Sequence, residues 1–173
     1  MLTRDQIIAA LKELDQELTQ LKVRGEIDIV GGTVMCLVFR ARESTKDVDA
    51  IMEPSEVIQK AAFNVSETLK LENQFWINDS VKVFASHRPE FIEFNLSLSH
   101  LKVMTATPHY LFAMKALSAR AGTNDEDDLI LLKKELNLKE MKQALQLIER
   151  FYPKQKLSIE SQTMLRDLFE ENE

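Results

Sequence analysis

The sequence is poor in the residues on which several common site chemistries depend. Its 173 residues include one cysteine, Cys36, and three histidines, His87, His100 and His109. A single cysteine excludes an internal disulfide and a cysteine-rich zinc site. The histidines lack the spacing of a metal-binding pair, so we expect them to be surface or helix-start residues. Cys36 lies in an apolar stretch and is interpreted as a small core residue.

Long apolar runs and the common nucleotide-binding glycine motifs are also missing. No run approaches the roughly 20 apolar residues that span a bilayer, and the N-terminus has no apolar signal-peptide segment. We therefore expect a cytoplasmic protein without membrane contact. The Walker loop, the Rossmann glycine pattern and the serine nucleophile elbow are absent. A formal charge of −6 argues against a surface built for non-specific nucleic-acid binding.

The residues that are present are sufficient for a packed core, because 45% of them are hydrophobic. Apolar periodicity and capping residues predict an α/β (α+β) fold. The predicted helices are 4–22, 34–39, 55–71, 80–85, 109–121, 125–136, 139–152 and 159–171, and the predicted strands are 27–30, 47–53, 91–96 and 101–106. We expect residues 1–106 to form a small mixed sheet with flanking helices, and residues 107–173 to form a helical region packed on it.

Capping residues support several of these helices. Thr3 and Gln6 form a predicted capping box for the first helix. Thr33 is expected to cap the short helix after the glycine pair. Thr107 precedes a proline at the first helical position, and Gly122 is expected to stop that helix.

The stretch from Ile27 to Met52 is the main candidate for chemistry. A mostly apolar run ends in Gly31 and Gly32, and Asp47 and Asp49 follow in a strand-like sequence. Residues i and i+2 of a strand share a face, so the two carboxylates are expected to project side by side. Adjacent carboxylates repel each other, and a divalent cation relieves that repulsion. A Gly-Gly corner leaves backbone N–H groups open to a phosphate.

Positive side chains gather beside the two acids, at Arg40, Arg42 and Lys46. One interpretation is a contact with a triphosphate or an RNA end. The other is a set of ordinary solvated loop charges. The residues alone leave both interpretations open.

The order of strand, Gly-Gly, short helix and Asp-x-Asp strand resembles the nucleotidyltransferase superfamily. The resemblance implies that Gly31, Gly32 and Thr33 hold a triphosphate and that Asp47 and Asp49 bind Mg²⁺. Members of the superfamily carry a further acid on a later strand. Glu93 is the best candidate here, because it alternates with apolar residues in the predicted strand 91–96.

Downstream residues resemble a bacterial branch of that superfamily, which includes abortive-infection (AbiEii-like) and toxin–antitoxin nucleotidyltransferases. The similar segments are 75–79, 107–116, Arg120 and 125–129. The resemblance implies that Lys115, Asp125 and Asp128 close the site. We expect Lys115 at the edge of the buried stripe of its helix, from which it reaches a phosphate. The alternatives are a surface ion pair for Lys115 and a favourable helix-dipole interaction for the two acids.

The predicted activity is transfer of a nucleoside monophosphate from an NTP to an acceptor hydroxyl of an RNA end or a protein. A toxin–antitoxin or phage-defence role, with an antitoxin partner, follows from the resemblance. Asp49 or Glu93 is expected to take the acceptor proton. The alternative is an inactive nucleotide- or protein-binding module. The expected catalytic residues are Asp47, Asp49, Lys115 and Asp128; the nucleotide contacts are Gly31, Gly32, Thr33, Arg42, Ser44, Thr45 and Lys115; the metal ligands are Asp47, Asp49 and Glu93.

Overall fold

The structure of the protein is a computed structural model that describes residues 1–86, 88–120 and 123–170. The chain divides into two compact units. Unit 1 comprises residues 1–83 and 91–106, and unit 2 comprises residues 84–90 and 107–173. The sequence predicts a division into residues 1–106 and 107–173, and this division stays a prediction. His87, Gly122 and the expected helix ends at 121 and 171 lie outside the described residues.

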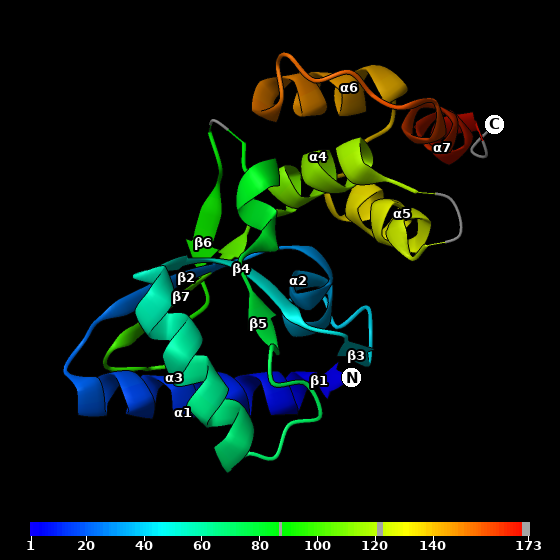
Figure 1. The fold of residues 1–173 in the computed structure, drawn as a ribbon. Helices are drawn as coiled ribbons and strands as arrows, with labels where there is room; N and C mark the ends of the chain where they lie inside the picture. Colours follow the sequence, from blue (N-terminus) through cyan, green and yellow to red (C-terminus); the bar gives the residue numbers. More distant parts are fainter. Residues whose placement is uncertain (87, 121–122, 171–173) are drawn as a thin grey trace. The chain divides into compact units, whose positions relative to one another are not determined.

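Unit 1 is built on a five-stranded mixed sheet, which confirms the predicted fold class (Figure 1). In spatial order its strands are β5 (Ile77–Asn78), β4 (Val48–Glu53), β2 (Gly25–Ile29), β7 (Leu101–Ala106) and β6 (Phe91–Glu93). β2 is antiparallel to β4 and parallel to β7. β5 is parallel to β4, and β6 is antiparallel to β7. A separate two-stranded pair joins β1 (Leu2–Thr3) to β3 (Ser44–Thr45).

Two helices of unit 1 cover one face of this sheet. The helices of unit 1 are α1 (Arg4–Leu21), α2 (Gly31–Leu37) and α3 (Ser55–Thr68). α1 and α3 contact each other (Figure 1). A Cβ atom on Gly25 would lie 3.0 Å from Ile58 of α3 and 3.1 Å from Leu18 of α1. Ile27 and Ile29 share this face by strand alternation, and both are fully buried. The face of β2 turned away from α1 and α3 therefore carries its polar residues.

The N-terminus of α1 confirms the predicted capping box. The side chain of Thr3 accepts a hydrogen bond from the backbone of Gln6, and the Gln6 side chain accepts one from the backbone of Thr3. α1 ends where Lys22 adopts a left-handed conformation. Local side-chain chemistry was therefore sufficient to place the start of this helix.

α2 begins at Gly31, before the start expected from a cap at Thr33, and the prediction that Thr33 caps it is wrong. Val30 occupies the capping position, and Thr33 lies inside the first turn. The Thr33 hydroxyl instead donates to the backbone oxygen of Asp47, at 2.9 Å. Thr33 does not cap the helix because it lies inside the first turn, and its hydroxyl proton is used by a residue fourteen positions away. The other end of the helix is held by Arg4, whose Nε donates to the Leu37 carbonyl at 3.0 Å.

Three other elements of unit 1 differ from their predicted forms. The strand predicted at 91–96 ends at Glu93, and the helix predicted at 55–71 ends at Thr68. The segment predicted as a helix at 80–85 is a 3₁₀ helix, η1 (Ser80–Phe84). Ser97 and Lys70, which follow the first two elements, have left-handed backbones with φ of 56° and 51°. Single residues in this conformation turn the chain, and neither is a glycine that would have signalled it.

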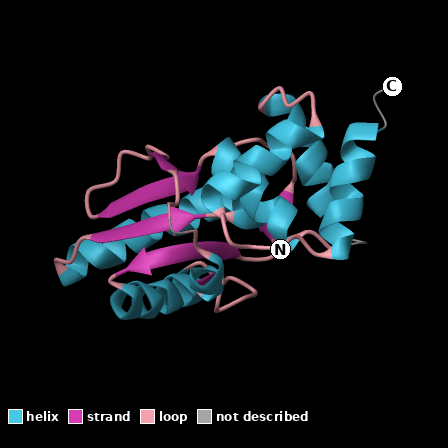
Figure 2. Cartoon of the chain, turned by 90° about the horizontal axis from the view of Figure 1, so that it is seen from above, coloured by secondary structure: helices cyan, strands magenta, loops and turns pink. Residues whose placement is uncertain are grey.

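The regular secondary structure described between residues 107 and 170 is helical, and Figure 2 draws the helices in cyan. The helices of this segment are α4 (Pro108–Ser118), α5 (Asp125–Glu135), α6 (Met141–Phe151) and α7 (Ile159–Glu170). Thr107 caps α4 as predicted, accepting from the Tyr110 N–H at 3.3 Å. The Tyr110 ring lies 5.2 Å from that of Phe151, centroid to centroid, and joins α4 to α6. Among the helices that the structure describes, none is long and apolar enough to cross a membrane.

Candidate functional site

Gly31 and Asp49 meet at the point where β2 ends and α2 begins. The Val30 N–H donates to the backbone oxygen of Asp49 at 2.9 Å, which joins this corner to β4. Gly31 has φ of 67°, a left-handed conformation that glycine adopts without a side-chain clash. A Cβ atom at Gly31 would lie 3.2 Å from Oδ2 of Asp49. The absence of a side chain at Gly31 therefore leaves space for the Asp49 carboxylate.

Gly32 provides the same kind of space for a positive group. A Cβ atom there would lie 3.0 Å from Nη1 of Arg42 and 3.3 Å from Oγ1 of Thr45. The two glycines thus have an acid beside one and a guanidinium beside the other. Four of the predicted nucleotide contacts therefore lie close to one another in unit 1. They are Gly31, Gly32, Arg42 and Thr45.

The backbone of Asp47 is held by two buried threonines. Thr33 and Thr45 are 1% and 8% exposed. Their hydroxyl groups donate to the backbone oxygen of Asp47 at 2.9 and 3.2 Å. Asp47 directly precedes β4 and is followed two residues later by Asp49, and both acids are half-buried. Only Asp49 lies within β4, so the shared face expected for the two side chains stays a prediction.

Ser44 has a different setting from the other predicted phosphate contacts. It lies in β3, opposite Thr3 of β1. Its backbone therefore belongs to the small two-stranded pair, which ties the N-terminus of α1 to the segment that leads into β4. Ser44 pairs with Thr3 in the two-stranded sheet, whereas the hydroxyl of the adjacent Thr45 donates to the backbone oxygen of Asp47.

Glu93 is not brought to the two aspartates. The strand order separates its strand, β6, from β4 by β7 and β2, which makes three strand steps. Neighbouring strands are about 4.8 Å apart, so the backbone of Glu93 is about 14 Å from that of β4. Glu93 is also exposed. Among the described residues, no third Asp, Glu, His or Cys lies close enough to share one ion with Asp47 and Asp49.

Asp28 is an acid of this region that sequence reasoning missed. It pairs with Ile51 of β4, and Ile51 shares a face with Asp49, so Asp28 is a diagonal neighbour of Asp49. Its Oδ1 is buried and has no hydrogen-bond partner among the residues that the structure describes. Burial raises the pKa of Asp28, Glu26 raises it further, and Lys102 lowers it by less. Alternation of Asp28 with the apolar residues of β2 was the signal that could have identified it.

Lys115 lies in unit 2 with the two acids that the resemblance had grouped with it. The prediction that it lies at the edge of the buried stripe is wrong, because it is 7% exposed. Its Nζ is 3.2 Å from Oδ1 of Asp125 and 2.5 Å from Oδ2 of Asp128. A buried ammonium needs such partners, since an unpaired charge is costly in the interior. We name Lys115, Asp125 and Asp128 the lysine cluster.

Asp125 has a polar environment despite its partial burial. Burial by itself raises the pKa of Asp125, but the hydroxyl of Thr123 and the ammonium of Lys115 more than offset this, and the pKa is lowered. Thr123 donates to Oδ2 at 2.7 Å, and the Arg120 N–H donates to the same oxygen at 3.4 Å. The ionised form of Asp125 is therefore favoured. The lysine cluster holds the first turn of α5 against α4 by charge.

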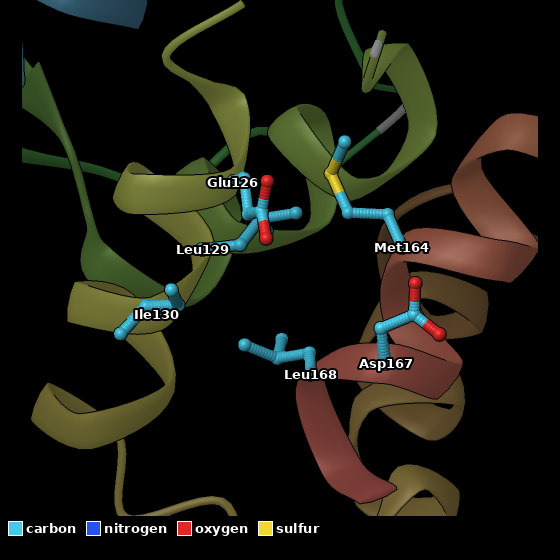
Figure 3. Close-up of a pocket in the computed structure, with 6 residues that line it drawn as sticks. All are labelled: Glu126, Leu129, Ile130, Met164, Asp167 and Leu168. Atoms are coloured by element: carbon cyan, nitrogen blue, oxygen red, sulfur yellow. The ribbon is translucent and has the colours of Figure 1, made fainter. Parts of the chain in front are cut away.

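A small hollow in unit 2 lies between α5 and α7 (Figure 3). Its lining residues are Glu126, Leu129, Ile130, Met164, Asp167 and Leu168. Leu129 is fully buried and belongs to the core of unit 2. None of the residues predicted for the site lines this hollow.

Comparison with known proteins agrees with the superfamily resemblance at a coarse level. Residues 9–170 match the model of a protein family described as "Nucleotidyltransferase of unknown function (DUF6036)". Neither the curated proteins nor the solved structures include a match to this chain.

Proposed function

Because this chain belongs to a family of nucleotidyltransferases of unknown function (DUF6036), we propose that it transfers a nucleoside monophosphate from an NTP to an acceptor hydroxyl in a Mg²⁺-dependent reaction. The observation that carries the proposal is the packing of Gly31 and Asp49. Gly31 has a left-handed backbone conformation, and a Cβ atom built on it would lie 3.2 Å from Oδ2 of Asp49, the second acid of the Asp-x-Asp pair. Because residue 31 is a glycine, there is open space beside the Asp49 carboxylate, and a side chain at position 31 would occupy that space.

The residues present fit a magnesium ion. Asp47 and Asp49 offer oxygen ligands, and Mg²⁺ is usually held by one or two carboxylates together with phosphate oxygens and water. Two protein carboxylates therefore suffice when the nucleotide supplies the remaining ligands. When bound, the ion neutralises charge that develops on the phosphates and aligns the reacting groups.

The protein residues divide the other tasks. The backbone N–H groups of Gly31, Gly32 and Thr33 lie in the first turn of α2, where such groups lack intrahelical partners and suit phosphate oxygens. Arg42 adds positive charge beside Gly32. We assign these groups to the β- and γ-phosphates. The position of Lys115 within the lysine cluster supports a structural task there, so the phosphate contact proposed for it is the less favoured of its two roles.

The reaction that we propose is a displacement at the α-phosphorus. The acceptor oxygen forms the new bond, the bond between the α-phosphorus and the bridging oxygen breaks, and pyrophosphate leaves with that electron pair. The acceptor proton passes to Asp49, since Glu93 is three strands away. An RNA end or a protein side chain is the proposed acceptor. A toxin–antitoxin or phage-defence role, with an antitoxin partner, is part of the same proposal and is supported by the sequence resemblance alone.

A second candidate function is a nucleotide- or protein-binding module without catalysis. The observation that favours it is the lack of a third metal-binding acid beside Asp47 and Asp49 among the described residues. The two candidates differ in turnover. They also differ in whether nucleotide binding depends on a divalent ion.

Thermal unfolding with each NTP, in the presence and absence of Mg²⁺, tests the site. We expect stabilisation that requires both ligands and is lost in Asp49→Asn. Glu53→Gln is the matched control, because Glu53 is exposed at the end of the same strand and the substitution removes the same charge. A lack of any shift in the wild type with all four NTPs would overturn the nucleotide site.

Transfer of label from the α-phosphate of an NTP into RNA and protein extracts then tests catalysis. Incorporation by the wild type that is lost in Asp47→Asn supports the enzyme. Metal-dependent stabilisation without incorporation supports the binding module. Equal incorporation by the wild type and Asp47→Asn would show that the catalytic assignment is wrong.

A further inference from the structure

We propose that Asn78 is a positioning residue that acts on the proposed metal site through Asp47. Nδ2 of Asn78 donates to Oδ2 of Asp47 at 3.3 Å. Asn78 lies in β5, in register with Asp49 of the neighbouring strand β4. Its side chain therefore reaches the earlier acid of the pair. The proposal rests on the proposed function and adds a residue to it that no part of the sequence analysis assigned.

The orientation of the Asn78 amide is determined by Ser80. Oδ1 of Asn78 accepts from the Ser80 N–H at 3.1 Å and from the Ser80 hydroxyl at 2.6 Å. Rotation of the amide by 180° would place its NH₂ group against the Ser80 N–H and its oxygen against a carboxylate oxygen. Both contacts would be unfavourable. Nδ2 must therefore face Asp47.

The segment around Asn78 is held on both sides by α3. Trp76 is fully buried, and its Nε1 donates to the backbone oxygen of Ala62 at 2.9 Å. Asp79 accepts from the hydroxyl of Ser55 at 3.1 Å, at the first residue of α3. Asn78 lies between these two anchors. Its backbone position is thus set by the core and is not that of a free loop.

One oxygen of the Asp47 carboxylate, Oδ2, is occupied by the hydrogen bond from Asn78. Within the part of the chain that the structure describes, Asn78 is the residue that hydrogen-bonds the Asp47 carboxylate. Thr33 and Thr45 hold the backbone of the same residue. The backbone and side chain of Asp47 are therefore both restrained, and Oδ1 is presented to an ion at little further entropic cost. Hydrogen bonds of this kind orient the ligands of metal sites.

Mn²⁺ binding to the full chain, measured by the electron paramagnetic resonance of the free ion, tests the assignment. We expect Asn78→Ala to bind Mn²⁺ about 10-fold more weakly than the wild type, because loss of an outer hydrogen bond to a metal ligand has effects of this size. Ser80→Ala should lose about 3-fold, since the Ser80 N–H still orients the amide. In an Asp47→Asn background, Asn78→Ala should cause no further loss.

Asn95→Ala is the matched control. Oδ1 of Asn95 accepts from the N–H of Ser97, so this asparagine forms the same type of turn, but after strand β6. We expect its Mn²⁺ affinity to equal that of the wild type. Equal losses in Asn78→Ala and Asn95→Ala would reveal a general effect of lost turns and overturn the inference.

The remaining outcomes separate this inference from the proposed function. A wild type that binds no Mn²⁺ overturns the proposed metal site and the inference with it. A wild type that binds, with Asn78→Ala binding equally well, overturns the inference alone. If Asn78→Ala does not fold, Ser80→Ala decides, and an unchanged affinity in that variant is the contrary result.

Discussion

Replacement of Lys115 by methionine distinguishes a structural from a catalytic role for the lysine cluster. Lys115 is 7% exposed. Its Nζ lies 3.2 Å from Oδ1 of Asp125 and 2.5 Å from Oδ2 of Asp128. Methionine has a similar length but leaves two acids without their shared cation. Removal of one partner of a buried ion pair costs about 3–5 kcal/mol. We expect the lower end, about 3 kcal/mol, because Asp125 keeps its hydrogen bonds from Thr123 and Arg120.

The measurement is thermal and urea unfolding followed by circular dichroism. For a chain of this length, about 3 kcal/mol corresponds to a decrease in Tm of about 6–12 °C. Adding Asp128→Asn to Lys115→Met should restore part of the loss, because one of the unpaired charges is removed. Lys134→Met is the matched control, since Lys134 is exposed on α5, and its effect should stay within about 0.5 kcal/mol.

If Lys115→Met unfolds within about 1 °C of the wild type, yet loses all stabilisation by NTP, the lysine serves the nucleotide and the structural role is wrong. If Lys115→Met has a much lower Tm than the wild type, yet NTP raises the Tm of both proteins by the same amount, the lysine serves the packing of α5 on α4.

Three further outcomes follow from the geometry of unit 1. Gly31→Ala should destabilise the protein by about 1–2 kcal/mol, because φ of Gly31 is 67° and the new Cβ would lie 3.2 Å from Oδ2 of Asp49. Calorimetric titration of this variant should also show weaker NTP binding. Asp28→Asn should raise stability at pH 7, because burial raises the pKa of Asp28 and so disfavours its ionised form in the folded protein. The stability that the wild-type residue contributes is greatest below its unfolded pKa and is lost as pH rises through the folded pKa. Equal Tm differences between the variant and the wild type at pH 4 and pH 7 would contradict this. Burial raises the pKa of Asp15, but the N–H groups of His100, Ser99 and Leu101 more than offset it, and the pKa is lowered below 3.8. Stability from Asp15 should therefore be complete above about pH 5 and fade as pH falls through the folded pKa, and an acid-unfolding curve of Asp15→Asn that matches the wild type would contradict this.

The elements that local chemistry predicts well are those whose signals lie within a few neighbouring residues. Thr3 with Gln6, and Thr107 before a proline, place the starts of α1 and α4 correctly. Thr33 differs from these residues because its partner is distant in the sequence. The sequence suggested that its hydroxyl oxygen accepts from a nearby backbone N–H, but Thr33 lies inside the helix and its hydroxyl donates to a carbonyl fourteen residues away, which no local rule indicates.

The burial of Lys115 could not be predicted from its own helix for the same reason. A helical pattern assigns a lysine to the surface because an isolated buried ammonium is unstable. The two acids that make burial possible come from α5, and their approach depends on how α4 and α5 pack. Charge pairing between helices is a tertiary property, so periodicity within one helix does not contain it.

The mixed α+β class and the Gly-Gly corner could be read from the sequence, because they depend on local periodicity and on the backbone freedom of glycine. The tertiary structure alone decided the neighbours of Asp47 and Asp49. Strand order moved Glu93 three strands away, brought Asn78 to Asp47 and placed Asp28 diagonal to Asp49. Which strands become neighbours depends on packing across the whole sheet, and spacing along the chain does not encode it.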